Sequence, residues 1–233
     1  MSSLTSSVLV AGSVLAIAGG QVFAGEEGDV GFRLIDGTLT TVLASDEDGD
    51  TEGAFLNDGQ RVFAADLNGA GFADEPGFYI NSFSDIADGL FLGYRNIGPL
   101  LRWDASSQTF VDAGTTLTQI NGPFTQDTPT TDVVEEGFRF AYTGGEFDEH
   151  PDLQLNDIST SGAFLWNLEF FLAADMTTSD VVQETQNVFV VLNFGLDEAS
   201  FDEAFEAAEA IIPTPASGVV LGLAGLMAVR RRR

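Results

Sequence analysis

The residues with the clearest potential for chemistry form one short acidic run. It offers carboxylates at four alternate positions: Asp46, Asp48, Asp50 and Glu52. Such carboxylates can converge when a loop curls around a hard cation, and Ca²⁺ takes six to eight oxygen ligands. An EF-hand does not fit, because that register would need Gly at Thr51 and Glu at Asn57. The run is therefore a candidate Ca²⁺-binding loop of another kind, although a solvated acidic turn is the preferred interpretation.

Two further segments could hold a cation. The loop from Asp66 to Gly69, with Asp74 and Glu75 nearby, repeats the acidic pattern. His150 is the only histidine, and it lies among carboxylates. A histidine in such company can ligate a metal or act as a base, but one histidine does not supply the two-histidine motifs of most catalytic zinc sites. Because the next residue is a proline and the neighbours are polar, we expect a loop, and a plain surface histidine is the preferred interpretation.

Motifs for catalysis are absent from the sequence. It contains neither a Gly-x-Ser-x-Gly elbow nor a phosphate-binding glycine-rich loop. Glycoside hydrolysis needs two carboxylates. Because the chain has 36 acidic residues, this requirement does not identify any particular pair. Trp103 and the tyrosines could stack on sugar rings, although a tryptophan is more often a core residue. We therefore assign no catalytic or cofactor-binding residue and expect no enzyme, with Ca²⁺ as the one candidate ion.

The charge of the chain is strongly asymmetric. All 36 acidic residues lie within residues 25–212, which hold only five of the nine basic residues, so this body carries 5 − 36 = −31 formal charges. Such a surface repels phosphate backbones, which argues against nucleic-acid binding. It attracts cations, and its self-repulsion depends on screening by salt. There is no cysteine, so neither a disulfide nor a cysteine-based zinc site can form.

The elements that would position these residues are mostly strands. Residues 30–35 and 38–43 flank Asp36-Gly37, which is a strong hairpin signal, and Asp58-Gly59 gives the same signal between residues 54–56 and 61–63. Two long segments, 163–174 and 188–194, are apolar on both faces, which is typical of strands in the middle of a packed sheet. Many short strands with regular turns predict an all-β fold, and we expect a jelly-roll-like β-sandwich.

Two segments depart from this strand pattern. Residues 121–136 are polar and contain two prolines, which predicts one long loop. Ser200 and Glu203 have the spacing of a capping box. An apolar stripe at helical spacing follows, and it predicts one short C-terminal helix packed on the sandwich: Phe201, Ala204, Phe205, Ala208 and Ile212.

The N-terminus has the order of a secretory signal peptide. Residues 8–17 are apolar, Gly19-Gly20 breaks a helix, and residues 22–24 are typical of a signal-peptidase site. Ala16 to Ala18 offer a second site, and Ala24 is preferred. The first segment lacks Lys and Arg, which departs from the usual pattern. We therefore expect a signal peptide over residues 1–24, with a buried N-terminal helix as the alternative.

The C-terminus has three parts in a fixed order. They are a small proline box, a stretch of about a dozen apolar residues from Gly218, and four arginines: Pro213, Thr214, Pro215, Ala216 and Ser217, then residues 218–229, then Arg230, Arg231, Arg232 and Arg233. A spanning helix needs about 20 apolar residues, so this stretch is a marginal permanent anchor. The arginines favour the cytoplasmic side. The tail therefore predicts a stop-transfer signal, with a plain tail anchor as the alternative.

This tail resembles the PEP-CTERM sorting domain, with Thr214 in place of the Glu that names the family. The resemblance implies processing by an exosortase, a membrane-embedded cysteine protease that cuts near the proline box. It also implies association with exopolysaccharide or biofilm matrix. Three body segments resemble a recurring family of PEP-CTERM exported proteins, without indicating any chemistry: residues 74–78, 101–104 and 191–195.

Together these features divide the chain into a signal peptide (1–24), one β-rich extracytoplasmic domain (25–212) and a sorting signal (213–233) with a short hydrophobic helix. We expect a non-catalytic protein of the cell surface or extracellular matrix. Its partners would be signal peptidase, an exosortase and extracellular polysaccharide, and its tail would hold it in the membrane before processing. The alternatives are a lectin-like module that binds carbohydrate with the help of Ca²⁺ and, third, a secreted glycan-active enzyme.

Overall fold

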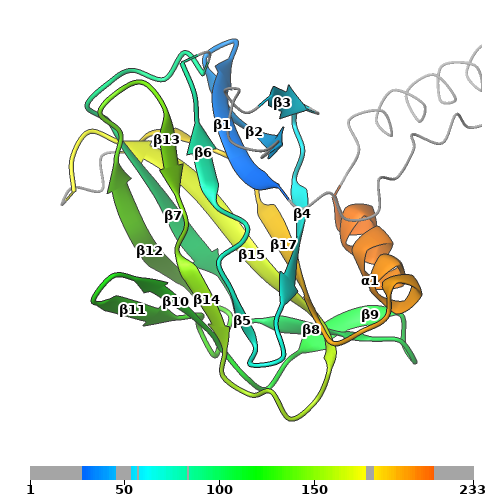
Figure 1. Cartoon of the computed structure of the whole chain (residues 1–233). Coiled ribbons are helices and arrows are strands. Elements are labelled where there is room, and N and C mark those ends of the chain that lie inside the picture. The colour runs from blue at the N-terminus through cyan, green and yellow to red at the C-terminus, as the bar shows by residue number, and fades with distance from the viewer. Residues whose placement is uncertain (1–27, 46–53, 57, 83, 177–180, 213–233) are drawn as a thin grey trace, which may run out of the picture.

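The computed structural model describes residues 28–45, 54–56, 58–82, 84–176 and 181–212. In this part of the chain, strands form three sheets, and one helix follows them (Figure 1). The expectation of mostly β structure with one short helix is therefore confirmed, and the arrangement is consistent with an all-β sandwich. The signal peptide and the C-terminal sorting helix lie outside the described residues. No helix among the described residues combines the length and the apolar character needed to cross a membrane.

The largest sheet has the order β12-β7-β15-β17-β4. Strand β15 also pairs with β16 and β8, and β8 pairs with β9. The bounds are β4 Val62–Leu67, β7 Phe91–Ile97, β8 Leu101–Asp104, β9 Thr109–Asp112, β12 Val134–Ala141, β15 Gly162–Ala173, β16 Val181–Glu184 and β17 Val188–Phe194. The long apolar segments thus form the central strands β15 and β17, as predicted.

Two smaller sheets form the facing layer, with the orders β13-β6-β1-β2-β3 and β11-β10-β14-β5. The bounds in the first are β1 Asp29–Ile35, β2 Thr38–Ser45, β3 Ala54–Leu56, β6 Phe78–Ile80 and β13 Phe147–Glu149. Those in the second are β5 Phe72–Ala73, β10 Leu117–Asn121, β11 Phe124–Asp127 and β14 Asp152–Leu155.

The chain crosses twice from one of these smaller sheets to the other. Residues 74–77 connect β5 to β6, and His150 and Pro151 connect β13 to β14. Because β5 pairs with β14 and β6 pairs with β13, the two crossings lie next to each other. We call this place the seam. The candidate site described below lies on it.

One apolar core fills the space between the layers. It takes the inward side chains of β15 and β17, including Trp166, Phe170 and Val190, together with Phe32 and Phe78 from the facing layer. The aromatic rings meet edge to face, with centroids 4.7 Å apart for Phe32 and Phe170. This geometry is favoured by the ring quadrupoles.

A second, smaller core explains why β15 and β17 are apolar on both faces. Helix α1 (Glu198–Ile211) buries Phe201, Ala204, Phe205 and Ala208 against the outer face of the large sheet, as the apolar stripe predicted. The sheet contributes the alternate side chains of its central strands, among them Leu165 and Val191. Figure 1 shows α1 beside β4 and β17, on the side away from the smaller sheets.

Of the predictions for single turns, loops and helix ends, one is confirmed and the others need correction. The Asp36-Gly37 hairpin is confirmed, because β1 and β2 pair antiparallel and both turn residues have positive φ. The predicted hairpin at Asp58-Gly59 is wrong, because β3 pairs with β2 whereas β4 pairs in parallel with β17 in the other layer. The predicted loop 121–136 contains β11 and the start of β12. Helix α1 begins earlier than predicted, with Asp197 as its N-cap accepting a hydrogen bond from the Ser200 amide.

Candidate functional site

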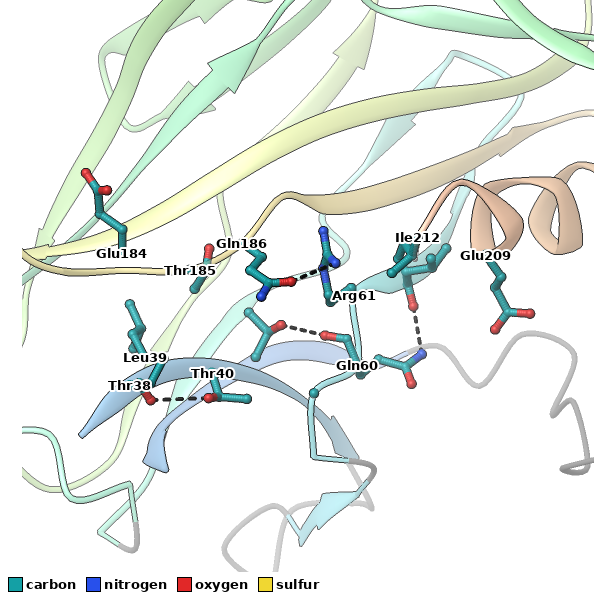
Figure 2. A pocket seen from close by; sticks show the side chains of 13 residues that line it. Thr38, Leu39, Thr40, Gln60, Arg61, Glu184, Thr185, Gln186, Glu209 and Ile212 are labelled. Carbon is teal, nitrogen blue, oxygen red and sulfur yellow. Dashed lines mark hydrogen bonds between the residues drawn. The ribbon is translucent and has the colours of Figure 1, made fainter. Parts of the chain in front are cut away.

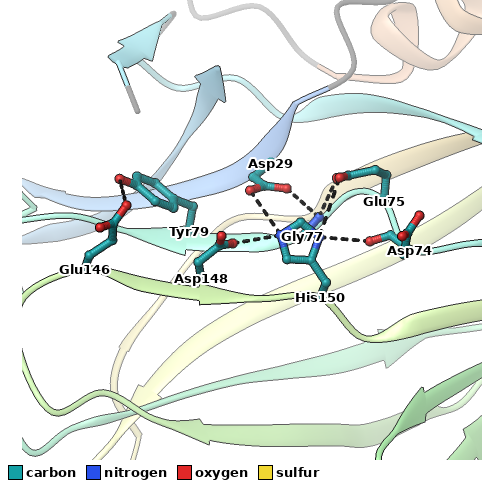
Figure 3. Close-up of polar contacts among 8 residues, drawn as sticks. All are labelled: Asp29, Asp74, Glu75, Gly77, Tyr79, Glu146, Asp148 and His150. Atoms are coloured by element: carbon teal, nitrogen blue, oxygen red, sulfur yellow. Dashed lines mark hydrogen bonds and ion pairs between the residues drawn. The ribbon is translucent and has the colours of Figure 1, made fainter. Parts of the chain in front are cut away.

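Four ionisable side chains gather on the outer surface of the seam, and we call them the seam cluster: Asp29, Glu75, Asp148 and His150 (Figure 3). The His150 Nε2 atom lies 2.8 Å from Asp148 Oδ1 and 3.7 Å from Asp29 Oδ2. On the other side of the ring, Nδ1 lies 3.6 Å from Glu75 Oε1. One imidazole therefore faces three carboxylates.

The backbone around the seam holds these side chains in place. His150 Nδ1 lies 3.0 Å from the Asp74 carbonyl oxygen, which can only accept a hydrogen bond. Nδ1 therefore carries a proton. The Gly77 amide donates hydrogen bonds to Asp29 Oδ1 at 2.7 Å and to Glu75 Oε2 at 3.1 Å.

Burial differs among the members of the seam cluster. The Asp29 side chain is only 7% exposed, those of His150 and Glu75 are about one-third exposed, and that of Asp148 is half exposed. A buried carboxylate loses hydration that favours its charged form. Burial accordingly raises the pKa of Asp29, although the charge of His150 acts in the opposite direction.

The other members titrate at shifted values as well. Burial, the charge of Asp29 and a hydrogen bond with Asp29 raise the pKa of Glu75 to about 7. Burial alone would lower the pKa of His150, but Asp29, the Asp74 carbonyl, Glu75 and Asp148 together raise it to about 9. The cluster can therefore hold a proton between its carboxylates at neutral pH.

The described structure brings together residues that the sequence analysis treated separately. His150, expected to be a plain surface histidine, is instead enclosed by acidic partners. Asp74 and Glu75 were assigned to a second acidic loop, whereas they contact His150 through a carbonyl and a carboxylate. In that loop, Asn68 Oδ1 accepts hydrogen bonds from the amides of Ala70 and Phe72, so it caps the turn between β4 and β5.

Sequence analysis missed Asp29, Asp148 and Gly77 as site residues. A signal existed for Asp148, because it belongs to the acidic run from Glu146 to Asp152 that surrounds His150. No local pattern marks Asp29, which reaches the site only through sheet pairing. The predicted Ca²⁺ ligands Asp46, Asp48, Asp50 and Glu52 lie outside the described residues, as do Ala24 and the whole of 213–233.

A groove of about 760 Å³ with both apolar and polar walls lies elsewhere on the molecule, between β2, residues 59–62, residues 184–186 and the end of α1 (Figure 2). Its walls include Thr38, Thr40, Gln60, Arg61, Glu184 and Gln186. Arg61 is held by hydrogen bonds from Nε to the Asn187 carbonyl at 2.7 Å and from Nη1 to Gln186 Oε1 at 2.9 Å. The groove thus offers hydroxyls, amides and a fixed guanidinium, groups that can hydrogen-bond a polar ligand.

Comparisons with known proteins add no assignment. No protein-family model matches the chain, and neither a curated protein nor a solved structure is significantly similar to it.

Proposed function

We propose that the chain is an exported, non-catalytic protein of the cell surface or extracellular matrix, associated with exopolysaccharide. Signal peptidase would cut after Ala24, and an exosortase would read Pro213 to Ser217. The observation that supports this proposal is that all described strands and the helix lie between the two predicted signals. Strand β1 begins at Asp29, and helix α1 ends at Ile211. Removal of both predicted signals would therefore leave every described strand and the helix intact.

The body can be stable outside the cytoplasm without disulfides. It carries −31 formal charges and no cysteine, so its stability rests on its two apolar cores rather than on disulfides. We propose a jelly-roll-like topology for its two layers, a finer description than the sandwich itself. The packing of an apolar core between a large sheet and two smaller ones is in keeping with it.

Mass spectrometry of the protein recovered from its native host tests the processing. The intact mass should correspond to a chain without about the first 24 residues and without most of residues 213–233. Recovery of the complete 233-residue chain from the cell surface would contradict the proposal.

Charge substitutions test the stop-transfer role of the tail. Changing Arg230, Arg231, Arg232 and Arg233 to Ser should abolish sorting, because each cation at the bilayer centre costs about 2.5–3.5 kcal/mol on insertion scales. The matched control changes the same four residues to Lys, which keeps the charge and should keep the membrane orientation. Equal sorting of the Ser and Lys variants would refute the electrostatic argument.

A second candidate function is carbohydrate binding in the groove beside Arg61, assisted by Ca²⁺ at Asp46, Asp48, Asp50 and Glu52. The groove favours it, since threonine hydroxyls, glutamine amides and Arg61 match the hydroxyls of a sugar. A glycan array should show binding that Gln186→Ala weakens and that EDTA abolishes. Asp48→Asn combined with Asp50→Asn should act like EDTA. Binding unaffected by all three changes would exclude this function for the groove and the acidic run.

A further inference from the structure

Sheet pairing places two members of the seam cluster, Asp29 and His150, in one row with Gly77 between them. Strand β1 pairs in parallel with β6, with Val30 opposite Phe78, so Asp29 stands beside Gly77. Strand β13 pairs antiparallel with β6, with Glu149 opposite Phe78, so His150 stands on the other side of Gly77. Asp148 lies two residues before His150, and its Oδ1 atom is 2.8 Å from His150 Nε2.

The middle position of this row has no side chain. A Cβ atom added to Gly77 would lie 2.6 Å from Asp29 Oδ1 and 2.6–2.7 Å from two atoms of the His150 ring. Neighbouring strands are about 4.8 Å apart, so residues two strands apart meet only when the strand between them leaves room. Gly77 therefore allows Asp29 and His150 to meet above β6.

The three ligand atoms that meet there are one imidazole nitrogen and two carboxylate oxygens, all within 4.8 Å of one another. In a tetrahedral site with bonds of about 2.1 Å, ligand atoms are about 3.4 Å apart. The distances from Nε2 to Asp148 and to Asp29, 2.8 Å and 3.7 Å, lie on either side of that value. Small side-chain shifts would bring all three atoms to one ion.

The orientation of the ring suits a ligand. Nδ1 donates its proton to the Asp74 carbonyl, so a neutral His150 presents the lone pair of Nε2 toward Asp29 and Asp148. Metal-binding histidines commonly use their second nitrogen in this way, because the hydrogen bond fixes the tautomer and the direction of the ring. Without a metal ion, a proton on Nε2 takes this place and pairs with Asp148 Oδ1 at 2.8 Å, so a bound ion would replace that proton.

The excess of carboxylates over imidazole in the seam cluster would also favour binding of a divalent cation. Three carboxylates surround one imidazole, so even a protonated His150 offsets a single negative charge. A divalent cation would offset two charges at the place where the carboxylates converge.

We propose that Asp29, Asp148 and His150 bind one divalent transition-metal ion of the Zn²⁺ type and that this ion ties strand β1 to the β13–β14 crossing. A mixed nitrogen and oxygen set favours Zn²⁺ and its neighbours over Ca²⁺, which prefers oxygen alone. Water completes the coordination, as in other sites with three protein ligands. This inference is independent of the proposed export and of the predicted Ca²⁺ loop.

The test is titration of the full, untagged chain with ZnCl₂ after chelator treatment, in excess Mg²⁺ to occupy weak surface carboxylates. Calorimetry should give one Zn²⁺ per chain. Because His150 is the only histidine, NMR should show one pair of imidazole ring signals that shifts as Zn²⁺ is added. An absence of saturable binding, or saturation without an imidazole shift, would overturn the proposal and leave the cluster as an ion-pair network.

Variants assign the binding to these residues. Asp148→Asn should weaken Zn²⁺ binding by about 100-fold or more, beyond the 10–100-fold typical of residues that only support a ligand. Its side chain is half exposed, so the variant should fold, which its metal-free melting curve checks. Glu149→Gln is the matched control, because Glu149 lies between the two ligands on the opposite face of the strand. Equal affinity of these two variants would overturn the assignment.

A further variant separates this site from the acidic run. Asp48→Asn combined with Asp50→Asn removes two predicted Ca²⁺ ligands and should leave both the Zn²⁺ affinity and the imidazole shift unchanged. Loss of Zn²⁺ binding in this variant would place the ion at the acidic run and refute the seam site.

Discussion

Two polar clusters in this molecule differ in burial, in charge and in how their groups are paired. The first, which we call the amide network, lies in the core between the layers and consists of Tyr94, Asn96, Gln119 and Trp166. All four residues are fully or almost fully buried. The second is the seam cluster, which lies on the outer surface of the facing layer.

The amide network is neutral, and its members pair with one another. Trp166 Nε1 donates to Asn96 Oδ1 at 2.8 Å, and Gln119 Oε1 accepts from both Tyr94 and Asn96. The network links β7 and β15 of the large sheet to β10 of the facing layer. Satisfied hydrogen bonds remove the penalty of burial, so the network can position the two layers without any further partner.

The seam cluster, by contrast, is charged and unbalanced. Its hydrogen bonds fix the direction of each group, but its carboxylates outnumber its single imidazole. The comparison teaches that satisfied hydrogen bonds are compatible with a purely structural role, whereas convergent charge of one sign indicates a place for a cation. The predictions below test this difference.

The largest effect is expected from breaking the amide network. Asn96→Leu leaves the buried Trp166 N–H without a partner, at a cost of about 1–3 kcal/mol, and it removes one of the two hydrogen bonds that Gln119 Oε1 accepts. We expect the free energy of unfolding to fall by about 3 kcal/mol in urea denaturation. Asn156→Leu is the control, because Asn156 is exposed and bonds only to threonine hydroxyls. Similar losses in both variants would mean that the network has no special role.

A smaller loss of stability is expected when a side chain fills the space between Asp29 and His150 at Gly77, just before β6. Gly77→Ala forces Asp29 and His150 apart, and overpacking of this kind costs about 1–3 kcal/mol. Urea denaturation of the metal-free chain measures it, and Zn²⁺ binding should be lost as well. Gly69→Ala is the control, because a Cβ there meets no atom within 4 Å. A Gly77→Ala variant as stable as this control would show that the row is not tightly packed.

The strands show how much of the fold can be predicted from the sequence. Local patterns predicted the β1–β2 hairpin and the central strands β15 and β17, because a turn signal or a long apolar run determines them directly. The hairpin prediction at Asp58-Gly59 failed because the strands on either side pair in different layers. Tertiary packing, rather than the local turn signal, determines that pairing. Local patterns also missed β11, whose largely exposed side chains show no apolar alternation.

The candidate site was predictable only in part. His150 attracted attention because it is unique and lies among acidic residues. Its partner Asp29 is far away in the sequence, and the two meet only because β1 and β13 both pair with β6. The role of Gly77 follows from the same register. Such information resides in sheet topology, which a single sequence does not display.

The third prediction concerns pH and distinguishes the charged cluster from the neutral one. In the metal-free chain, the pKa values of Glu75 and His150 are raised to about 7 and about 9 from ordinary values of 4.5 and 6.5. The folded state therefore binds more protons than the unfolded state between these limits, and stability falls as pH rises. The Glu75 contribution should be lost between about pH 4.5 and 7, and that of His150 between about 6.5 and 9.

Urea denaturation at successive pH values measures this slope. Glu75→Gln should flatten the lower half of the profile, and His150→Gln should flatten the upper half. Asn96→Leu should lower the whole profile without changing its slope, because the amide network does not titrate in this range. A parental profile that rises between pH 7 and 9 would contradict the assignment to His150.

The smallest effect is expected from salt. The body carries −31 formal charges, and the screening length falls from about 30 Å at 0.01 M salt to about 10 Å at 0.1 M. Since self-repulsion opposes compaction, NaCl should raise the melting temperature over this range and have less effect above it. The Asn96→Leu variant should melt lower at every salt concentration but gain the same increment, because its loss arises from neutral groups inside the core. A larger increment in this variant would mean that core packing and surface charge are coupled, and a flat curve for the parent chain would show that its surface charge does not limit its stability.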